Sequence, residues 1–248
     1  MNKQVSEVRA YVQGFIQAAL PLEKCEVVVA PPSTHLTTLG SEAQNRVFQI
    51  AGQNCGPAAS GAFTGEIAPG MLKELGADWV LLGHSERRHV FHEDEALIGK
   101  RLSAALSAGL KVIFCVGETL SERKQGTTRA VIEKQLGNLK LAQKGKDLVV
   151  AYEPVWAIGT GEVATPEQAE EAHRWIAEWC GAELGQTPRI LYGGSVKPEN
   201  SAELMAQRHV DGLLVGGASL EAESFAAIIR HGVRGWESKV SLMKEVLK

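Results

Sequence analysis

Cysteine is scarce in this sequence of 248 residues, and its spacing argues against a disulfide framework. The four cysteines lie far apart, form no C-x-x-C pair and follow no secretory segment. They are Cys25, Cys55, Cys115 and Cys180. Because disulfides persist mainly in oxidising compartments, this pattern predicts free thiols in a reducing compartment, with the cytoplasm as the default location.

Excess positive charge and long apolar runs are missing as well. The formal net charge is -3 and the isoelectric point is about 6.2, which leaves no basic field for duplex nucleic acid or an anionic membrane. No apolar run approaches the ~18 residues that a membrane span requires. We therefore expect neither nucleic acid nor a membrane as a partner, and an anionic ligand must be bound by local backbone groups.

Seven short apolar runs predict buried strands, and segments with helical periodicity separate them. The runs are residues 27–30, 47–51, 79–82, 112–116, 148–152, 189–192 and 212–215. Near-continuous apolar strands are typical of a parallel sheet that is covered on both faces. We expect one α/β domain over residues 1–248, without a linker. The pattern predicts a (β/α)8 barrel, which brings the carboxyl ends of all strands to one face.

The two ends of the chain depart from the eightfold pattern. The sequence opens on a helix that includes Val5, Val8 and Val12, with Asn2 as its cap, and no strand pattern precedes it. Residues 231–248 are expected to form a C-terminal tail, a turn followed by a short helix, and supply no replacement strand. Seven strands are therefore expected where a closed barrel needs eight.

One predicted strand delivers a single carboxylate to its carboxyl end. The run 148–152 leads into Glu153, and Pro154 stops further strand pairing. A Pro-Val-Trp turn follows, and then Gly-Thr-Gly at 159–161, whose backbone freedom suits both movement and close approach to a ligand. We interpret Glu153 as a base and residues 155–163 as its lid.

A histidine follows another predicted strand. His84 comes after the run 79–82, in the string GHSERR. A lone histidine at such a place is more often structural, but His84 and Glu153 stand at strand ends on the same face of the predicted barrel. A carboxylate and an imidazole facing one cavity are what proton transfer beside a carbonyl group requires. Because His84 also opens a helix, the helix dipole is expected to keep its ring neutral.

Glycines follow the last two predicted strands, in the strings YGGS and VGGAS. Either string alone could be a simple turn. Together they match the backbone cradle that barrels carry for a phosphate group after their last two strands. Gly159 in the predicted lid can add a third donor loop.

The strings AYEPVWAIGTG, GHSERR, YGGSV and LVGGAS resemble, in this order and spacing, the triosephosphate isomerase family. The similarity runs from Met1 to about Arg230, and four motifs in register make it specific. The resemblance implies a TIM barrel with a glutamate base, a neutral histidine and a closing loop, which is the established pattern of this family.

Carried over by position, the resemblance implies a role for each candidate residue. Glu153 is then the base that moves a proton between the two carbons of dihydroxyacetone phosphate and D-glyceraldehyde 3-phosphate. His84 polarises the carbonyl group, and Glu86 supports the site. The backbone groups that hold the phosphate are those of Gly159, Ser195, Gly216 and Gly217.

The same resemblance implies which partners to expect. Triose phosphates of glycolysis and gluconeogenesis are the small-molecule substrates, and no cofactor or metal ion is required. A homodimer is expected in which Thr64, in the loop 61–66, inserts beside the active site of the other copy.

His89 and His92 form an H-x-x-H string, but no third ligand lies near, so we expect them on a helix surface.

The start of the sequence departs from the family. The family's first strand carries an Asn and a catalytic Lys in a string like N-W-K-M-N, and this sequence begins at the Met-Asn that would follow that Lys. Losing one such donor lowers the catalytic rate by a factor on the order of 10² to 10³, so the isomerase activity of this chain is expected to be impaired. We expect that an internal Met was assigned as the start. The alternatives are a non-catalytic phosphate-ligand-binding or interaction protein on this scaffold, and a different phosphate-binding barrel enzyme.

Overall fold

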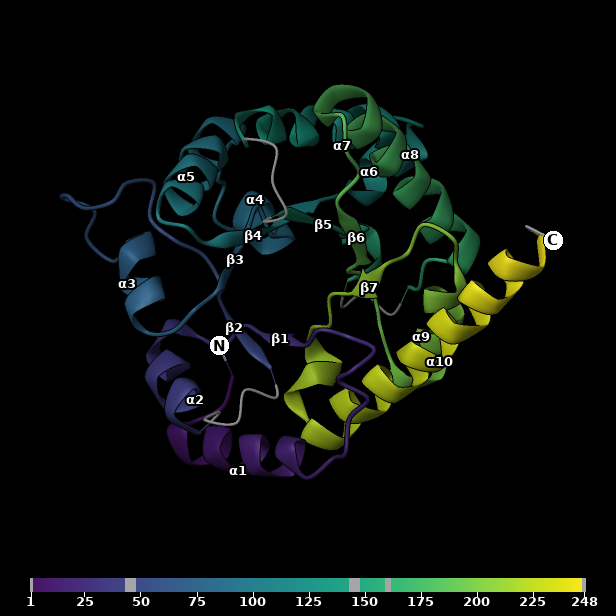
Figure 1. Cartoon of the computed structure of the whole chain (residues 1–248). Helices are drawn as coiled ribbons and strands as arrows, with labels where there is room; N and C mark the ends of the chain where they lie inside the picture. Colours follow the sequence, from purple (N-terminus) through teal and green to yellow (C-terminus); the bar gives the residue numbers. More distant parts are fainter. Residues whose placement is uncertain (1, 43–47, 143–147, 159–161, 247–248) are drawn as a thin grey trace.

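The computed structural model describes residues 2–42, 48–142, 148–158 and 162–246. Its strands form one seven-stranded sheet, in which each strand pairs in parallel with the next along the chain. The strands are β1 (Val28–Val29), β2 (Gln49–Gly52), β3 (Trp79–Leu82), β4 (Lys111–Val116), β5 (Leu148–Tyr152), β6 (Arg189–Tyr192) and β7 (Gly212–Leu213). The sheet curls into a ring with helices outside it (Figure 1). The α/β-barrel architecture that the sequence predicts is thus confirmed, with seven described strands.

The predicted strands differ from the observed ones mainly at the two ends of the sheet. β3, β5 and β6 have the predicted bounds, whereas β1 and β7 have only two residues each. Within the described part of the chain, β1 pairs only with β2 and β7 only with β6. A strand with one neighbour makes ladder hydrogen bonds on one side only, so less of it is held in regular structure. Residue 47, in the second predicted strand, lies outside the described residues.

The two faces of the sheet bury different cores. In β5, Leu148, Val150 and Tyr152 pack with the helices, whereas Val149 and Ala151 point into the barrel. All five are buried, as a strand covered on both faces requires. The core inside the barrel consists of Ala51, Trp79, Leu81, Ile113, Cys115, Val149 and Ala151. The barrel interior is therefore packed, and this packing fixes the strand ends that carry the candidate site.

Helices alternate with the strands around the outside of the ring (Figure 1). The α-helices are α1 (Val5–Ile16), α2 (Leu36–Glu42), α3 (Pro69–Glu74), α4 (Ser85–His89), α5 (Glu95–Ser107), α6 (Leu120–Lys124), α7 (Thr128–Leu136), α8 (Pro166–Leu184), α9 (Pro198–Ala206) and α10 (Ala222–Val246). The 3-10 helices are η1 (Ser33–His35), η2 (Gly137–Leu141), η3 (Val155–Ala157) and η4 (Gly217–Leu220). The cap of α1 is Gln4 and not Asn2, because the Glu7 side chain accepts a hydrogen bond from the Gln4 backbone N–H at 2.6 Å.

The C-terminal residues do not form the predicted turn and short helix. Residues 231–246 instead continue α10, a helix of 25 residues that lies beside α9 (Figure 1). Gly232 and Gly235 suggest a turn in the sequence, but in the fold they let the two helices approach closely. A Cβ atom on Gly235 would lie 2.0 Å from the carbonyl oxygen of Ala202.

Candidate active site

Glu153 is held at the carboxyl end of β5. Its backbone N–H donates to the Val116 carbonyl oxygen at 2.7 Å, which extends the contact with β4 by one residue. Pro154 follows and has no N–H with which to continue the ladder. The Glu153 side chain is only 3% exposed. A carboxylate buried to this degree needs hydrogen-bond partners inside the protein.

His84 and Ser85 are those partners. The Ser85 backbone N–H donates to Glu153 Oε2 at 2.8 Å, and Glu153 Oε1 lies 3.0 Å from His84 Nε2. His84 caps α4, because its Nδ1 accepts from the Glu86 backbone N–H at 3.3 Å. A neutral ring that accepts at Nδ1 carries its proton on Nε2, so Nε2 donates to Glu153. The fold therefore brings together the two residues that the sequence predicts as the proton-transfer pair.

Two glycines make room for Glu153. A Cβ atom on Gly117 would lie 1.8 Å from the Glu153 carbonyl oxygen, and one on Gly193 would lie 2.9 Å from Glu153 Cγ. Gly117 follows β4 and Gly193 follows β6, the strands on either side of β5. Both positions need glycine because the backbone or side chain of Glu153 occupies the space of a side chain.

Neighbouring carboxylates act on the pKa of His84 in the direction opposite to the one expected from the helix dipole. Burial lowers the pKa of His84, but the hydrogen bond and charge of Glu153, together with the charge of Glu86, outweigh burial and raise this pKa above its usual value. Glu86 lies 4.0 Å from His84 Nδ1 and its side chain is 73% exposed, so it acts from the solvent side. α4 has five residues, and its dipole is weak beside a carboxylate at 3.0 Å. Glu153, and not the helix dipole alone, therefore controls the charge of the ring.

Cys115 lies against Glu153. The Cys115 side chain is fully buried. Burial, then the charge of Glu153 and a hydrogen bond with it, raise the pKa of this thiol well above its usual value. A thiol that stays protonated donates to a carboxylate and is a poor nucleophile. The contact with Glu153 could have been found from the sequence, because Cys115 lies near the end of the strand next to β5.

Glu118 is a fully buried carboxylate just after β4, and it is not among the residues predicted from the sequence motifs. It accepts hydrogen bonds from the Tyr152 hydroxyl group at 3.1 Å and from Trp156 Nε1 at 2.9 Å, and it pairs with Arg123 at 3.2 Å. Its carbonyl oxygen accepts from the Val155 N–H at 3.0 Å. Glu118 therefore ties down η3, the first turn of the predicted lid. The available signal was a carboxylate two residues after the apolar run 112–116.

The predicted phosphate-binding residues lie in the turns after β6 and β7. Ser195 follows β6, and its carbonyl oxygen accepts a hydrogen bond from Asn200 Nδ2 at 2.9 Å. Gly216 and Gly217 are exposed, and nothing lies within 4 Å of the position that a Cβ atom would take at either residue. A ligand can therefore approach this backbone closely. Gly159 lies outside the described residues, and its role stays a prediction.

Thr64 stands on an exposed loop that projects from the barrel beside α3 (Figure 1). Residues 61–66 are all exposed, including the large apolar side chain of Phe63. The base of the loop is anchored, because Arg101 donates to both carboxylate oxygens of Glu66, at 2.7 and 2.8 Å. Such a two-bond arginine–carboxylate pair has a fixed geometry. The loop thus presents Thr64 to solvent from a rigid base.

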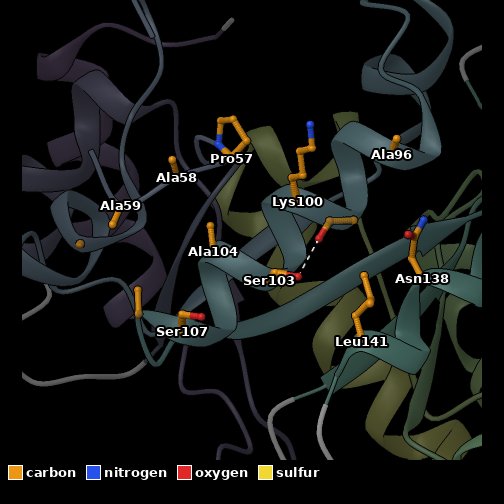
Figure 2. Close-up of a pocket in the computed structure, with 13 residues that line it drawn as sticks. Pro57, Ala58, Ala59, Ala96, Lys100, Ser103, Ala104, Ser107, Asn138 and Leu141 are labelled. Atoms are coloured by element: carbon orange, nitrogen blue, oxygen red, sulfur yellow. Dashed lines mark hydrogen bonds between the residues drawn. The ribbon is translucent and has the colours of Figure 1, made fainter. Parts of the chain in front are cut away.

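A groove of about 660 Å³ lies elsewhere, on the outer side of α5 between residues 57–59 and η2 (Figure 2). Small side chains such as Ala104 line much of it, and Lys100 alone is charged among the described residues that line it. Neither His84 nor Glu153 belongs to this lining. A general acid or base must lie within hydrogen-bond reach of its substrate, so we assign the chemistry to the strand ends and not to the groove.

Comparison with known proteins agrees with this geometry. The family model of triosephosphate isomerase matches residues 1–232. The chain belongs to the triosephosphate isomerase family.

Relatives in this family are similar along most of the chain. The triosephosphate isomerase of Nitratidesulfovibrio vulgaris strain DP4 is 47% identical over 240 residues, which cover 92% of this chain and 95% of that protein. The triosephosphate isomerase of Geotalea uraniireducens strain Rf4 is 46% identical over 237 residues, 93% of this chain and 94% of that protein. The chloroplastic triosephosphate isomerase of Fragaria ananassa is 51% identical over 209 residues, 82% of this chain and 66% of that protein.

The triosephosphate isomerase match ends within α10, so residues 233–246 of this helix lie beyond it.

In the described ranges, no group of three or more His, Cys, Asp or Glu side chains is arranged to hold a metal ion. His89 and His92 are both exposed, but only His89 lies on a helix, at the end of α4; His92 follows α4 in a left-handed backbone conformation, so the expected helix position is wrong for it. None of the helices in the described part of the chain is long and apolar enough to cross a membrane.

Proposed function

We propose that this member of the triosephosphate isomerase family interconverts dihydroxyacetone phosphate and D-glyceraldehyde 3-phosphate, a step shared by glycolysis and gluconeogenesis. The observation that carries the proposal is the buried carboxylate of Glu153, 3.0 Å from His84 Nε2 at the carboxyl ends of β5 and β3. The family match over residues 1–232 and the names of the relatives support the same substrate pair.

Glu153 is the base in this proposal. Its carboxylate takes a proton from the carbon beside the carbonyl group, and the electron pair of that C–H bond forms the double bond of an enediolate. Glu153 then returns the proton to the neighbouring carbon. His84 Nε2–H donates to the carbonyl oxygen and moves a proton between the two enediolate oxygens. Since Glu153 Oε1 now accepts from Nε2, substrate binding exchanges this contact for one between Nε2 and a substrate oxygen.

Backbone N–H groups bind the phosphate group of the substrate. The open space beside Gly216 and Gly217 supports this assignment. Residues 155–163 close as a lid that excludes water and retains the enediolate, whose early release would allow phosphate elimination. Glu118 anchors the start of this lid through Trp156, and Glu86 supports the site from the solvent side. The phosphate-binding residues are Gly159, Ser195, Gly216 and Gly217.

The active chain is a homodimer in this proposal, with Thr64 beside the active site of the other copy. Exposed large apolar side chains on the projecting loop and after α4 support an interface: Phe63 is 47%, Val90 65% and Phe91 60% exposed. Sedimentation tests the assembly, since Phe63→Asp is expected to convert dimers into monomers. An unmodified chain that sediments as a monomer contradicts it. A cytoplasmic location stays a prediction from the four free cysteines.

An isomerase assay of the purified chain tests the proposed reaction. With dihydroxyacetone phosphate as substrate, we expect glyceraldehyde 3-phosphate to form, and inorganic phosphate to compete with the substrate. Lys100→Ala in the outer groove is the matched control and is expected to leave turnover unchanged. A chain that binds inorganic phosphate without turnover would instead support the non-catalytic ligand-binding alternative.

A further inference from the structure

The last helix of the chain lies along α9, the helix that follows the Ser195 turn. α10 and α9 run side by side over the length of α9 (Figure 1). Two glycines of α10 face α9: a Cβ atom on Gly235 would lie 2.0 Å from the Ala202 carbonyl oxygen, and one on Gly232 would lie 3.5 Å from Met205 Cγ. The two helices therefore pack almost backbone to backbone, so α9 has little room to shift relative to α10.

At the first turn of α9, a side chain of α10 contacts the backbone. His231 Nδ1 lies 2.7 Å from the carbonyl oxygen of Pro198, the first residue of α9. A carbonyl oxygen can only accept a hydrogen bond, so Nδ1 carries the proton and His231 donates. This bond fixes the start of α9 against α10.

The first turn of α9 is in turn bonded to the Ser195 turn. Asn200 Nδ2 donates to the Ser195 carbonyl oxygen at 2.9 Å, and Asn200 Oδ1 accepts from the Lys197 N–H at 2.8 Å. One side chain on α9 therefore holds the backbone at both ends of the segment 195–197. The direction of the Ser195 peptide groups depends on where the first turn of α9 stands.

The far part of α10 anchors the segment that follows α9. Lys239 Nζ donates to the Val210 carbonyl oxygen at 2.7 Å, and the Lys239 side chain is buried. Val210 lies between α9 and β7, whose carboxyl end leads to Gly216 and Gly217. Lys239 belongs to the part of α10 beyond the family match. α10 thus contacts both the first turn of α9 and the segment that follows it, which keeps His231 in register with Pro198.

We propose that His231 is a positioning residue for the phosphate-binding turn at Ser195, acting through Pro198 and Asn200, and that residues 233–246 hold it in place. This inference rests on the proposed function, because it assigns His231 an effect on phosphate binding. His231 does not touch the substrate. It sets the backbone direction of groups that do, so its loss weakens phosphate binding more than it slows proton transfer.

The experiment compares His231→Leu with His231→Asn. Leucine fills similar space without a donor, whereas the Asn Nδ2 group can stand where His Nδ1 stands. The measurements are KM and kcat for dihydroxyacetone phosphate and the inhibition constant of inorganic phosphate. For His231→Leu we expect KM and the inhibition constant to rise about two- to tenfold, the range that one hydrogen bond supports, with kcat nearly unchanged. His231→Asn is expected to restore both constants.

Arg230→Ala is the matched control on the same helix. Arg230 Nη1 donates to the Ala18 carbonyl oxygen at 3.1 Å, so this variant also removes a bond from an α10 side chain to a backbone carbonyl group, but one that leads to α1. It is expected to lower the unfolding temperature without changing KM or the inhibition constant.

Three results overturn the inference while leaving the proposed function intact. They are unchanged constants in His231→Leu, the same rise in Arg230→Ala, and failure of a folded His231→Asn protein to restore phosphate binding. If the unmodified chain neither isomerises the substrate nor binds inorganic phosphate, the proposed function fails and the inference fails with it. The unmodified chain therefore tells the two failures apart.

Discussion

Glu153 and His84 share a contact of 3.0 Å although they follow strands that are not neighbours. The strand between them, β4, ends at Val116, and Gly117 follows it without a side chain. The missing side chain lets the Glu153 backbone lie close to Gly117. The position of the candidate base thus depends on a glycine of the neighbouring strand.

Gly117→Ala is expected to displace Glu153. The new Cβ atom would lie 1.8 Å from the Glu153 carbonyl oxygen, which is backbone and cannot turn aside. We expect kcat to fall by about 10²-fold, because a displacement near 1 Å has that effect, and the unfolding free energy to fall by about 1 to 3 kcal/mol. Enzyme assay and urea unfolding measure the two changes.

Gly137→Ala is the control for this substitution. Gly137 has helical backbone angles, and nothing lies within 4 Å of its Cβ position. Alanine there is expected to leave kcat unchanged and to raise the unfolding free energy by about 0.5 to 1 kcal/mol. A Gly117→Ala protein with the same kcat as Gly137→Ala contradicts the account.

Glu118→Ala is expected to be strongly destabilising. It leaves the Tyr152 hydroxyl group, the Trp156 N–H and the Arg123 charge without this acceptor. We expect the unfolding free energy to fall by about 3 to 5 kcal/mol, as for other buried ion pairs that lose one partner. Trp156→Phe removes one hydrogen bond and is expected to cost about 1 kcal/mol. Urea unfolding gives both values.

Glu133→Ala serves as the comparison for Glu118. Glu133 pairs with Arg129 at 2.8 Å on the exposed side of α7, and such pairs contribute about 0 to 1 kcal/mol. If Glu118→Ala costs no more than Glu133→Ala, Glu118 does not hold the start of the lid.

The buried His173 is expected to make the folded protein less stable in mild acid. It is fully buried in α8, and burial lowers its pKa from 6.5 to about 4. The hydrogen bond from Nδ1 to the His209 carbonyl oxygen, at 3.1 Å, raises the pKa but does not offset burial. Above pH 6.5 the ring is neutral in both states, so it adds no pH dependence. Between pH 6.5 and 4 only the unfolded chain takes up this proton, so the unfolding free energy falls as the pH falls, by about 3 kcal/mol in total.

Urea unfolding at several pH values between 4 and 7 tests this prediction. His173→Phe keeps a ring of similar size beside Tyr152 and Tyr192 but has no group that titrates there. We expect its unfolding free energy to depend less on pH across this range. Equal slopes for the two proteins would show that other groups cause the acid sensitivity.

The fold could be predicted from the sequence because its signals are local. Each apolar run carries the pattern of one buried strand, and a right-handed crossover through a helix leaves few ways to order parallel strands. Glu153, His84, Ser195, Gly216 and Gly217 follow such runs and could therefore be assigned to strand ends.

Features that depend on contacts distant in sequence could not be predicted in this way. In the sequence, Gly235 indicates a turn, whereas in the fold it allows close contact between α10 and α9. The pKa of His84 depends on its distance from Glu153, which the sequence does not give. The position of Glu118 after an apolar run is visible in the sequence, but its contacts with Tyr152 and Trp156 are visible only in the fold. In each case the contact joins residues that are far apart in the sequence.

The central claim is that Glu153 is the base, and Glu153→Gln tests it most directly. The amide keeps the shape of the side chain but cannot take the proton, so we expect kcat to fall by about 10² to 10⁴ or more. The measurement is kcat beside the dissociation constant for inorganic phosphate, in the same preparation of folded protein. The account predicts a loss of turnover with phosphate binding largely intact. Equal loss of turnover and phosphate binding would contradict it and make Glu153 a structural residue.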